Sequence, residues 1–188
     1  MLWSIITESI NSPIKSTTGA KNILTKINFP KEALITSGML KLLFNTSVKI
    51  ILLLIFIFFY GIDLSFGLLF FPFAVLGGLI VGNTIGLLLT PIGMLYQDIS
   101  KAITFGLQFV MYATPVVYAV PENGMMKTLM ELNPLTPIIT VGRNLAVGLP
   151  PNYLTGFLIV LAICIPSFFI ALVFYRISIP IFVERLSA

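Results

Sequence analysis

Four long apolar runs divide the chain, and short polar segments separate them. The runs lie at residues 39–60, 64–89, 103–120 and 153–175. An α-helix that crosses the hydrocarbon core of a bilayer needs about 20 mainly apolar residues. These runs are continuously apolar, whereas strands of a membrane barrel alternate over about 10 residues. The pattern therefore predicts an all-α integral membrane protein, a helical bundle with four full spans in a single domain covering residues 1–188.

The composition supports lipid as the solvent for most of the chain. Of the 188 residues, 57% are hydrophobic and 10% are charged, whereas soluble domains usually carry about 25% charged residues. A soluble protein of this size could not cover so much apolar surface with a polar exterior. We therefore expect the bilayer itself to be one of the protein's partners.

Several kinds of chemistry are disfavoured by the residue types present. The sequence has no histidine, and Cys164, its single cysteine, lies in an apolar run. This argues against histidine-based acid–base catalysis, a zinc site and a disulfide, and we expect no metal or cofactor. The phosphate-binding pattern GxxxxGK[ST], the GxSxG elbow and the HExxH zinc helix are also missing from the sequence. The sequence therefore carries no enzyme signature of these kinds, and no catalytic residue is proposed from it.

The distribution of basic residues predicts the orientation of the spans. Seven of the eleven lysines and arginines flank the spans on one side, two lie on the other side, and Lys41 and Lys49 fall inside the first span. Because lysine and arginine are enriched in cytoplasmic loops, both chain ends are predicted to be cytoplasmic in a multi-pass protein of the inner (plasma) membrane. Basic residues at span ends, rather than on one polar domain, argue against nucleic-acid binding.

Two segments outside the runs are harder to interpret. Residues 1–19 contain Glu8, Asn11 and Lys15 and are too polar for a span or a secretory signal. An amphipathic helix on the inner leaflet and a partial helix both remain open for them. Residues 121–152 are rich in proline, and their apolar middle is too short to span, so short re-entrant or interfacial helices on the outer side are expected there.

A glycine repeat lies in the second run. Gly78, Gly82 and Gly86 recur at every fourth position, which forms a groove on one face of a helix and lets another backbone approach closely. The partner helix could belong to the same subunit, to a second copy or to a moving element.

The first run carries polar residues at helical spacing. Lys41, Asn45 and Lys49 share one helix face, and charges at membrane depth usually face protein, water or headgroups. Lys41 is close enough to the span end to reach the headgroups. Lys49 lies two turns deeper, so a polar cavity or a partner carboxylate is expected beside it.

The third run carries an aromatic stripe. Phe105, Phe109 and Tyr112 share one helix face, where aromatic rings could hold the apolar faces of sugars. Ordinary packing or contact with lipid is the alternative for the same residues.

Four stretches together resemble a known family. They are NILTKINFPKEAL (22–34), YQD (96–98), TPVVY (114–118) and NPLTPIITVGR (133–143). In this order and spacing they resemble the membrane subunit of ABC-2 type exporters, and most closely the permeases that export polysaccharide, O-antigen and teichoic acid.

The resemblance implies a subunit that dimerises, pairs with ATP-binding cassette ATPase subunits, and moves a lipid-linked glycan. It implies an ATPase-docking surface at Lys26, Phe29, Pro30, Lys31, Glu32, Tyr96 and Asp98. Candidate residues of the substrate path are Lys49, Phe105, Phe109, Tyr112 and Tyr118, and those of an outer gate are Asn133, Pro134 and Arg143.

The chain also departs from the family pattern. Trp3 aligns partway along the family's second membrane helix, so residues 1–38 are expected to hold a partial helix followed by the cytoplasmic coupling segment. Gln97 stands where the family usually has arginine. An ABC-2 permease for a drug, lipid or peptide is the first alternative, and a membrane-embedded enzyme or assembly factor is the second.

Overall fold

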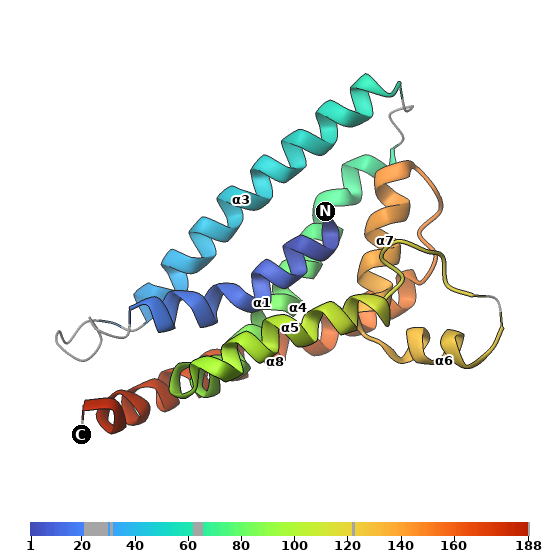
Figure 1. The fold of residues 1–188 in the computed structure, drawn as a ribbon. Helices are drawn as coiled ribbons and strands as arrows, with labels where there is room; N and C mark the ends of the chain where they lie inside the picture. Colours follow the sequence, from blue (N-terminus) through green and yellow to red (C-terminus); the bar gives the residue numbers. More distant parts are fainter. Residues whose placement is uncertain (21–29, 31, 62–65, 122, 188) are drawn as a thin grey trace.

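The structure, a computed structural model, is a bundle of α-helices (Figure 1). It describes residues 1–20, 30, 32–61, 66–121 and 123–187. These residues form α1 (Leu2–Gly19), α3 (Glu32–Phe59), α4 (Gly67–Leu95), α5 (Gln97–Tyr112), α6 (Met125–Leu132), α7 (Leu135–Val147) and α8 (Leu154–Ser187). No strand occurs in the described part of the chain, which agrees with the all-α expectation.

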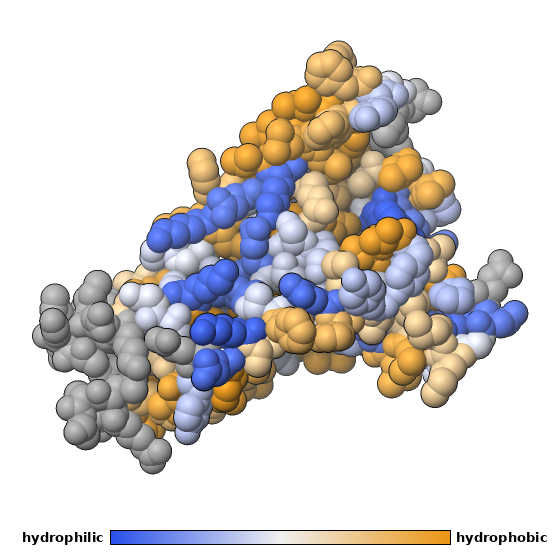
Figure 2. Space-filling model, viewed as in Figure 1, coloured by the Kyte–Doolittle hydropathy of each residue, from blue (hydrophilic) through white to orange (hydrophobic). Residues whose placement is uncertain are grey.

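Three of the described helices are long and apolar enough to cross a membrane. They are Glu32–Phe59, Gly67–Leu95 and Leu154–Phe182. The apolar 18-residue segment of α4 is 56% buried, whereas those of α3 and α8 are 17% and 11% buried. Figure 2 shows the hydrophobic surface that α3 leaves exposed. Such a surface is stable in contact with the hydrocarbon core of a bilayer, because the surface has few polar groups that need water.

The third predicted span differs from the helix found there. The sequence predicts a span over residues 103–120. In the structure, α5 begins at Gln97 and ends at Tyr112, and residues 113–118 form turns and bends. Pro115 explains the early end, because it lacks an N–H donor and restricts the residue before it. At 16 residues, α5 is about 24 Å long, shorter than a hydrocarbon core of about 30 Å.

The opening helix α1 lies inside the bundle and not on its surface. Ile5, Ile6, Ile10 and Ile14 are each only 1% exposed, and α1 runs along α4 (Figure 1). The interpretation of this segment as a helix lying on the inner leaflet therefore does not hold.

The glycine repeat of α4 faces α1. A Cβ atom at Gly82 would lie 2.4 Å from Ser9 Cβ, and one at Gly86 would lie 2.4 Å from the Ile10 carbonyl oxygen. Such distances are too short for any side chain, so the two backbones are in direct contact. Of the three partners considered for this groove, the helix in contact is one of the same subunit.

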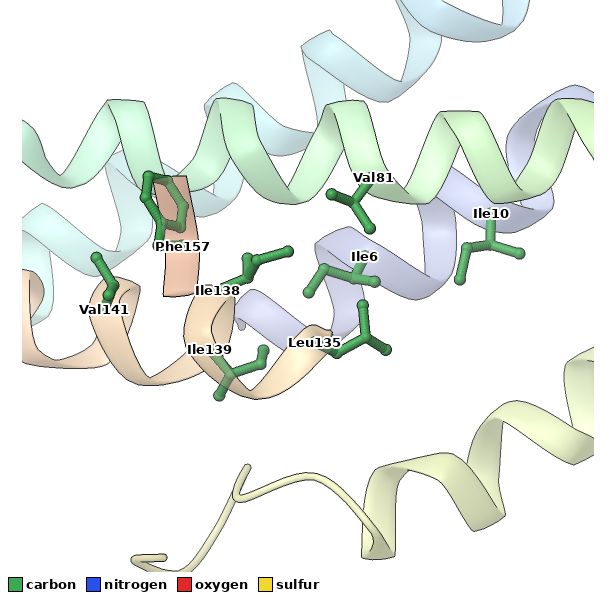
Figure 3. Close-up of a cluster of buried hydrophobic side chains, with 8 residues drawn as sticks. All are labelled: Ile6, Ile10, Val81, Leu135, Ile138, Ile139, Val141 and Phe157. Carbon is green, nitrogen blue, oxygen red and sulfur yellow. The ribbon is translucent and has the colours of Figure 1, made fainter. Parts of the chain in front are cut away.

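The short helix α7 is held in the bundle by a buried cluster. Figure 3 shows its members, which are Ile6, Ile10, Val81, Leu135, Ile138, Ile139, Val141 and Phe157. They come from α1, α4, α7 and the start of α8. Helix α6 is mostly exposed, with only Met130 buried. The two short helices between α5 and α8 thus differ: one is a core element and the other lies at the surface.

A second cluster joins α3, α4 and α8 near one end of the bundle. Ile35, Met94, Tyr175 and Ile179 are among its buried members, and the Tyr175 hydroxyl lies 3.1 Å from Thr17 Oγ1 near the end of α1. The start of α3 and the end of α8 therefore lie at the same end of the bundle (Figure 1).

Candidate functional site

The candidate site is a polar cavity between α1, α3 and α5. It has a volume of about 660 Å³. Its lining is Trp3, Thr7, Glu8, Asn11, Ser12, Lys15, Ser16, Gly38, Lys41, Leu42, Asn45, Thr104, Leu107 and Gln108. Figure 2 shows hydrophilic residues gathered over this region beside the hydrophobic surface of α3. A polar surface beside a membrane-spanning helix needs water or polar partners.

The deepest polar residue of α3 forms an ion pair with α1. Lys49 Nζ lies 2.5 Å from Glu8 Oε1 and donates a hydrogen bond of 2.7 Å to Ser4 Oγ. The lysine and glutamate side chains are 25% and 41% exposed. Lys49 therefore has a partner carboxylate, one of the two environments expected for it. The second carboxylate oxygen, Oε2, is buried with no hydrogen-bond partner among the described residues.

The charge of the cavity is positive. Lys15 and Lys41 contribute two positive charges to the lining, and Glu8 contributes one negative charge, which is paired with Lys49. Hydroxyl and amide groups supply the rest of its polar lining, and the Thr104 hydroxyl donates a hydrogen bond of 2.9 Å to Asn11 Oδ1, joining α5 to α1. The cavity can therefore accommodate a ligand rich in hydroxyl groups or one that carries negative charge.

The aromatic stripe of α5 lies outside this cavity. Phe105, Phe109 and Tyr112 are 61%, 62% and 68% exposed, and none of them belongs to the cavity lining. The Phe105 and Phe109 rings pack edge to face with centroids 5.1 Å apart. Within one subunit, therefore, neither these rings nor Lys49 line the cavity, although Lys49 pairs with the lining residue Glu8.

At the other end of α5, Asn133 connects two of the motifs. Its amide donates hydrogen bonds to Thr114 Oγ1 at 2.8 Å and to the Ala113 carbonyl oxygen at 3.3 Å. Its side-chain oxygen accepts a hydrogen bond of 2.9 Å from the Leu135 N–H, and Pro134 is the N-cap of α7. One side chain thus links the turn after α5 to the first turn of α7.

A second connection runs between Arg143 and Tyr118. Arg143 Nη1 donates a hydrogen bond of 3.1 Å to the Tyr118 carbonyl oxygen, and the Tyr118 hydroxyl donates one to the Tyr112 carbonyl oxygen. We call the hydrogen-bonded residues Thr114, Tyr118, Asn133 and Arg143 the α5–α7 network. It is built from the two motifs TPVVY and NPLTPIITVGR, which are distant in the sequence.

A smaller polar group lies close in sequence to the α5–α7 network. The Tyr153 hydroxyl donates a hydrogen bond of 3.4 Å to Glu131 Oε1, which is also 4.0 Å from Lys127 Nζ. Partial burial, followed by the charge of Glu131 and this hydrogen bond, raises the pKa of Tyr153.

The structure describes four of the seven predicted docking residues. Lys26, Phe29 and Lys31 lie outside the described residues. Pro30, Tyr96 and Asp98 are exposed, and Glu32 Oε1 lies 3.2 Å from Arg176 Nε of α8. The Asp98 carboxylate is 98% exposed and lies 3.9 Å from Lys101 Nζ. These side chains remain accessible to another protein.

Sequence reasoning missed the contribution of α1 to the cavity. In the sequence, Glu8, Asn11 and Lys15 serve only as evidence that residues 1–19 are too polar for a span. Their spacing of i, i+3 and i+7, however, places them on one helix face. That face meets the polar face of α3. The spacing could have identified a polar lining. Among the described residues, no group of three or more histidine, cysteine, aspartate or glutamate side chains could hold a metal ion.

The fold and the cavity define a polytopic α-helical membrane protein with a hydrophilic cavity beside its spans. Residues 1–147 match the family of ABC-2 type transporters. The match covers more than half of the chain, and the chain belongs to this family.

Three proteins that are similar to this chain carry the same name. Two proteins of Klebsiella pneumoniae, each named O-antigen export system permease protein RfbA, are 22% and 23% identical over 155 and 168 residues, or 80% and 84% of this chain. The protein of that name from Myxococcus xanthus is 24% identical over 141 residues, or 73% of this chain. These alignments cover 59%, 64% and 54% of the relatives, so the chain spans less than two thirds of their length.

Proposed function

We propose that this protein is the membrane-spanning subunit of an ATP-binding cassette exporter for a lipid-linked polysaccharide of the O-antigen, teichoic-acid or capsule type. The observation that carries the proposal is the similarity to three permeases named for O-antigen export, over 73% to 84% of the chain. Membership of the ABC-2 type transporter family supports the transport role.

The polar cavity supports a hydrophilic cargo. Its amide and hydroxyl groups could exchange hydrogen bonds with sugar hydroxyls, and its positive charge favours anionic substituents. A drug or lipid permease would instead be expected to present a mainly apolar cavity to its cargo. This difference favours a glycan over the first alternative.

The exposed aromatic stripe supports a path formed between two copies. Phe105, Phe109 and Tyr112 project from α5 next to the helix face that lines the cavity. If α5 of a second copy faces this stripe, the rings and the two cavities would border one route, along which rings can contact sugars without fixed hydrogen bonds.

The energy for transport would come from a separate ATPase subunit docked at the end where α3 begins. Pro30, Glu32, Tyr96 and Asp98 are accessible there, and charged side chains at a wet interface fix its register. Because Glu32 begins α3, a push on this residue would be transmitted along a helix that lines the cavity.

The test is ATP-dependent export by the full-length protein, reconstituted in proteoliposomes with its ATPase subunit and a lipid-linked glycan. Gln108→Leu, which removes a polar group from the cavity, should lower glycan export several-fold. Thr128→Leu, a matched change at an exposed position of α6, should leave export unchanged. Export without any ATPase, or ATPase stimulation by an apolar drug and not by the glycan, would contradict the proposal.

A further inference from the structure

A second cavity lies between the start of α3 and the later turns of α8. Its volume is about 530 Å³. Six apolar side chains form its walls: Ile35, Met39, Phe168, Phe169, Leu172 and Val173. We call it the α3–α8 groove. It does not share any lining residue with the polar cavity, so the proposed cargo path does not explain it, although Glu32 at its mouth also belongs to the predicted docking surface.

The mouth of the groove carries one positive and one negative side chain. Arg176 Nε lies 3.2 Å from Glu32 Oε1, and the two side chains are 79% and 49% exposed. The guanidinium group has five N–H donors, and this contact uses one of them. The carboxylate likewise keeps acceptor capacity on its second oxygen. A ligand at the mouth can therefore reach both charges.

The position of the groove indicates which molecule can fill it. Both of its helices are candidate membrane spans, and Glu32 is the first residue of α3. The charged mouth therefore lies at the end of a span, where headgroups are found, and the apolar walls continue from it toward the hydrocarbon. This order of polar and apolar groups matches that of a phospholipid.

We propose that the α3–α8 groove is a binding site for a phospholipid with a zwitterionic headgroup that carries a primary ammonium, such as phosphatidylethanolamine. The phosphate binds the free donors of Arg176, the ammonium donates hydrogen bonds to Glu32, and one acyl chain lies along Phe169, Leu172 and Val173. An anionic headgroup without the ammonium would meet the Glu32 carboxylate, and a choline headgroup has no N–H to donate. The proposal requires only that α3 and α8 lie in a bilayer, so it stands apart from the cargo.

The experiment measures which lipids stay bound to the purified full-length protein. The protein is taken from nanodiscs containing equal amounts of phosphatidylethanolamine, phosphatidylglycerol and phosphatidylcholine with identical acyl chains, and retained lipid is counted by native mass spectrometry. Phosphatidylethanolamine should be retained in preference to both others. Glu32→Gln should reduce this preference about tenfold, the usual effect of losing a hydrogen bond to a charged group. Arg176→Gln should lower retention of all three lipids.

Two further variants separate a built site from general contact with the bilayer. Val173→Trp fills the groove from an exposed position and should abolish selective retention while the melting temperature stays unchanged. The paired variant Lys127→Gln with Glu131→Gln removes another partly exposed ion pair, with atoms 4.0 Å apart and remote from the groove, and should change nothing. Equal retention of the three lipids by the wild-type protein, or full selectivity in the folded Val173→Trp variant, would overturn the proposal.

Discussion

At the scale of single residues, the contact between Lys49 and Glu8 is the shortest polar contact of the candidate site, at 2.5 Å. Both groups are more than half buried, so their charges have lost part of their contact with water. Removal of one partner leaves the other charge unpaired in a poorly solvated position, which costs more than removal of both. The pair is therefore expected to stabilise the α1–α3 contact only as long as it is complete.

The first prediction follows from this coupling. Lys49→Met should lower the unfolding free energy by about 1–3 kcal/mol, at the low end of values for buried pairs because both groups keep some solvent contact. The double variant with Glu8→Gln should recover part of this loss. Thermal unfolding of the four proteins of this double-mutant cycle in detergent measures the coupling. Additive effects of the two substitutions would show that the pair contributes nothing.

A second prediction concerns Asn133, which joins the turn after α5 to α7. Asn133→Ala removes the hydrogen bonds to Thr114 and Ala113, so residues 113–118 should exchange their amide hydrogens faster. Each lost hydrogen bond is worth about 1 kcal/mol, which corresponds to roughly fivefold faster exchange through local opening. Hydrogen-exchange mass spectrometry measures this, with Thr128→Ala on the exposed face of α6 as the control. Unchanged exchange in this segment would mean that other contacts hold it.

At the scale of secondary-structure elements, the α1–α4 contact depends on positions where no side chain fits. Gly86→Ala would place a methyl carbon 2.4 Å from the Ile10 carbonyl oxygen and 2.7 Å from Pro13 Cγ. A carbonyl oxygen in a helix cannot move away cheaply, so the helices must separate. Overpacking of this kind costs about 1–3 kcal/mol.

The third prediction compares two glycines. Gly86→Ala should lower the melting temperature and make the chain more sensitive to protease. Gly106→Ala on α5, where an added Cβ meets no atom within 4 Å, should leave both properties unchanged or slightly improved, because alanine favours the helix. Equal stability of the two variants would show that the α1–α4 contact can adjust.

The elements also show how far the sequence alone determines the fold. The apolar runs predicted α3, α4 and α8 because helices that face lipid (α3, α8) or lie inside a membrane bundle (α4) both carry mainly apolar side chains. The spacing of Gly78, Gly82 and Gly86 predicted a close helix contact, and the depth of Lys49 predicted a polar partner. The location of α1 could not be predicted in the same way, because the polar side chains of α1 pair with residues of α3 and α5 that are distant in the sequence. The end of α5 at Tyr112 was missed since the apolar composition continues past Pro115 although the backbone hydrogen bonding does not.

At the scale of the whole molecule, the distribution of charge predicts which side of the membrane each end of the bundle faces. Lys15, Lys101 and Arg176 belong to the group of seven basic residues on one side of the spans, and Lys127 and Arg143 form the smaller group on the other. The start of α3 and the end of α8 lie at one end of the fold (Figure 1), as this assignment requires. Since basic residues favour the cytoplasm, the end bearing Tyr96 and Asp98 should face the cytoplasm, where the proposed ATPase subunit would dock.

The fourth prediction tests this orientation by cysteine labelling. Cys164 is the single cysteine, so Cys164→Ser gives a background in which Asp98→Cys and Thr128→Cys can be introduced one at a time. Both positions are exposed, so a difference in labelling reports the side of the membrane and not burial. A membrane-impermeant maleimide added to intact cells should label the protein with cysteine at 128, and should label the one with cysteine at 98 only after permeabilisation. The opposite pattern would place the polar mouth of the α3–α8 groove on the outer leaflet and the predicted docking surface beyond the reach of cytoplasmic ATP.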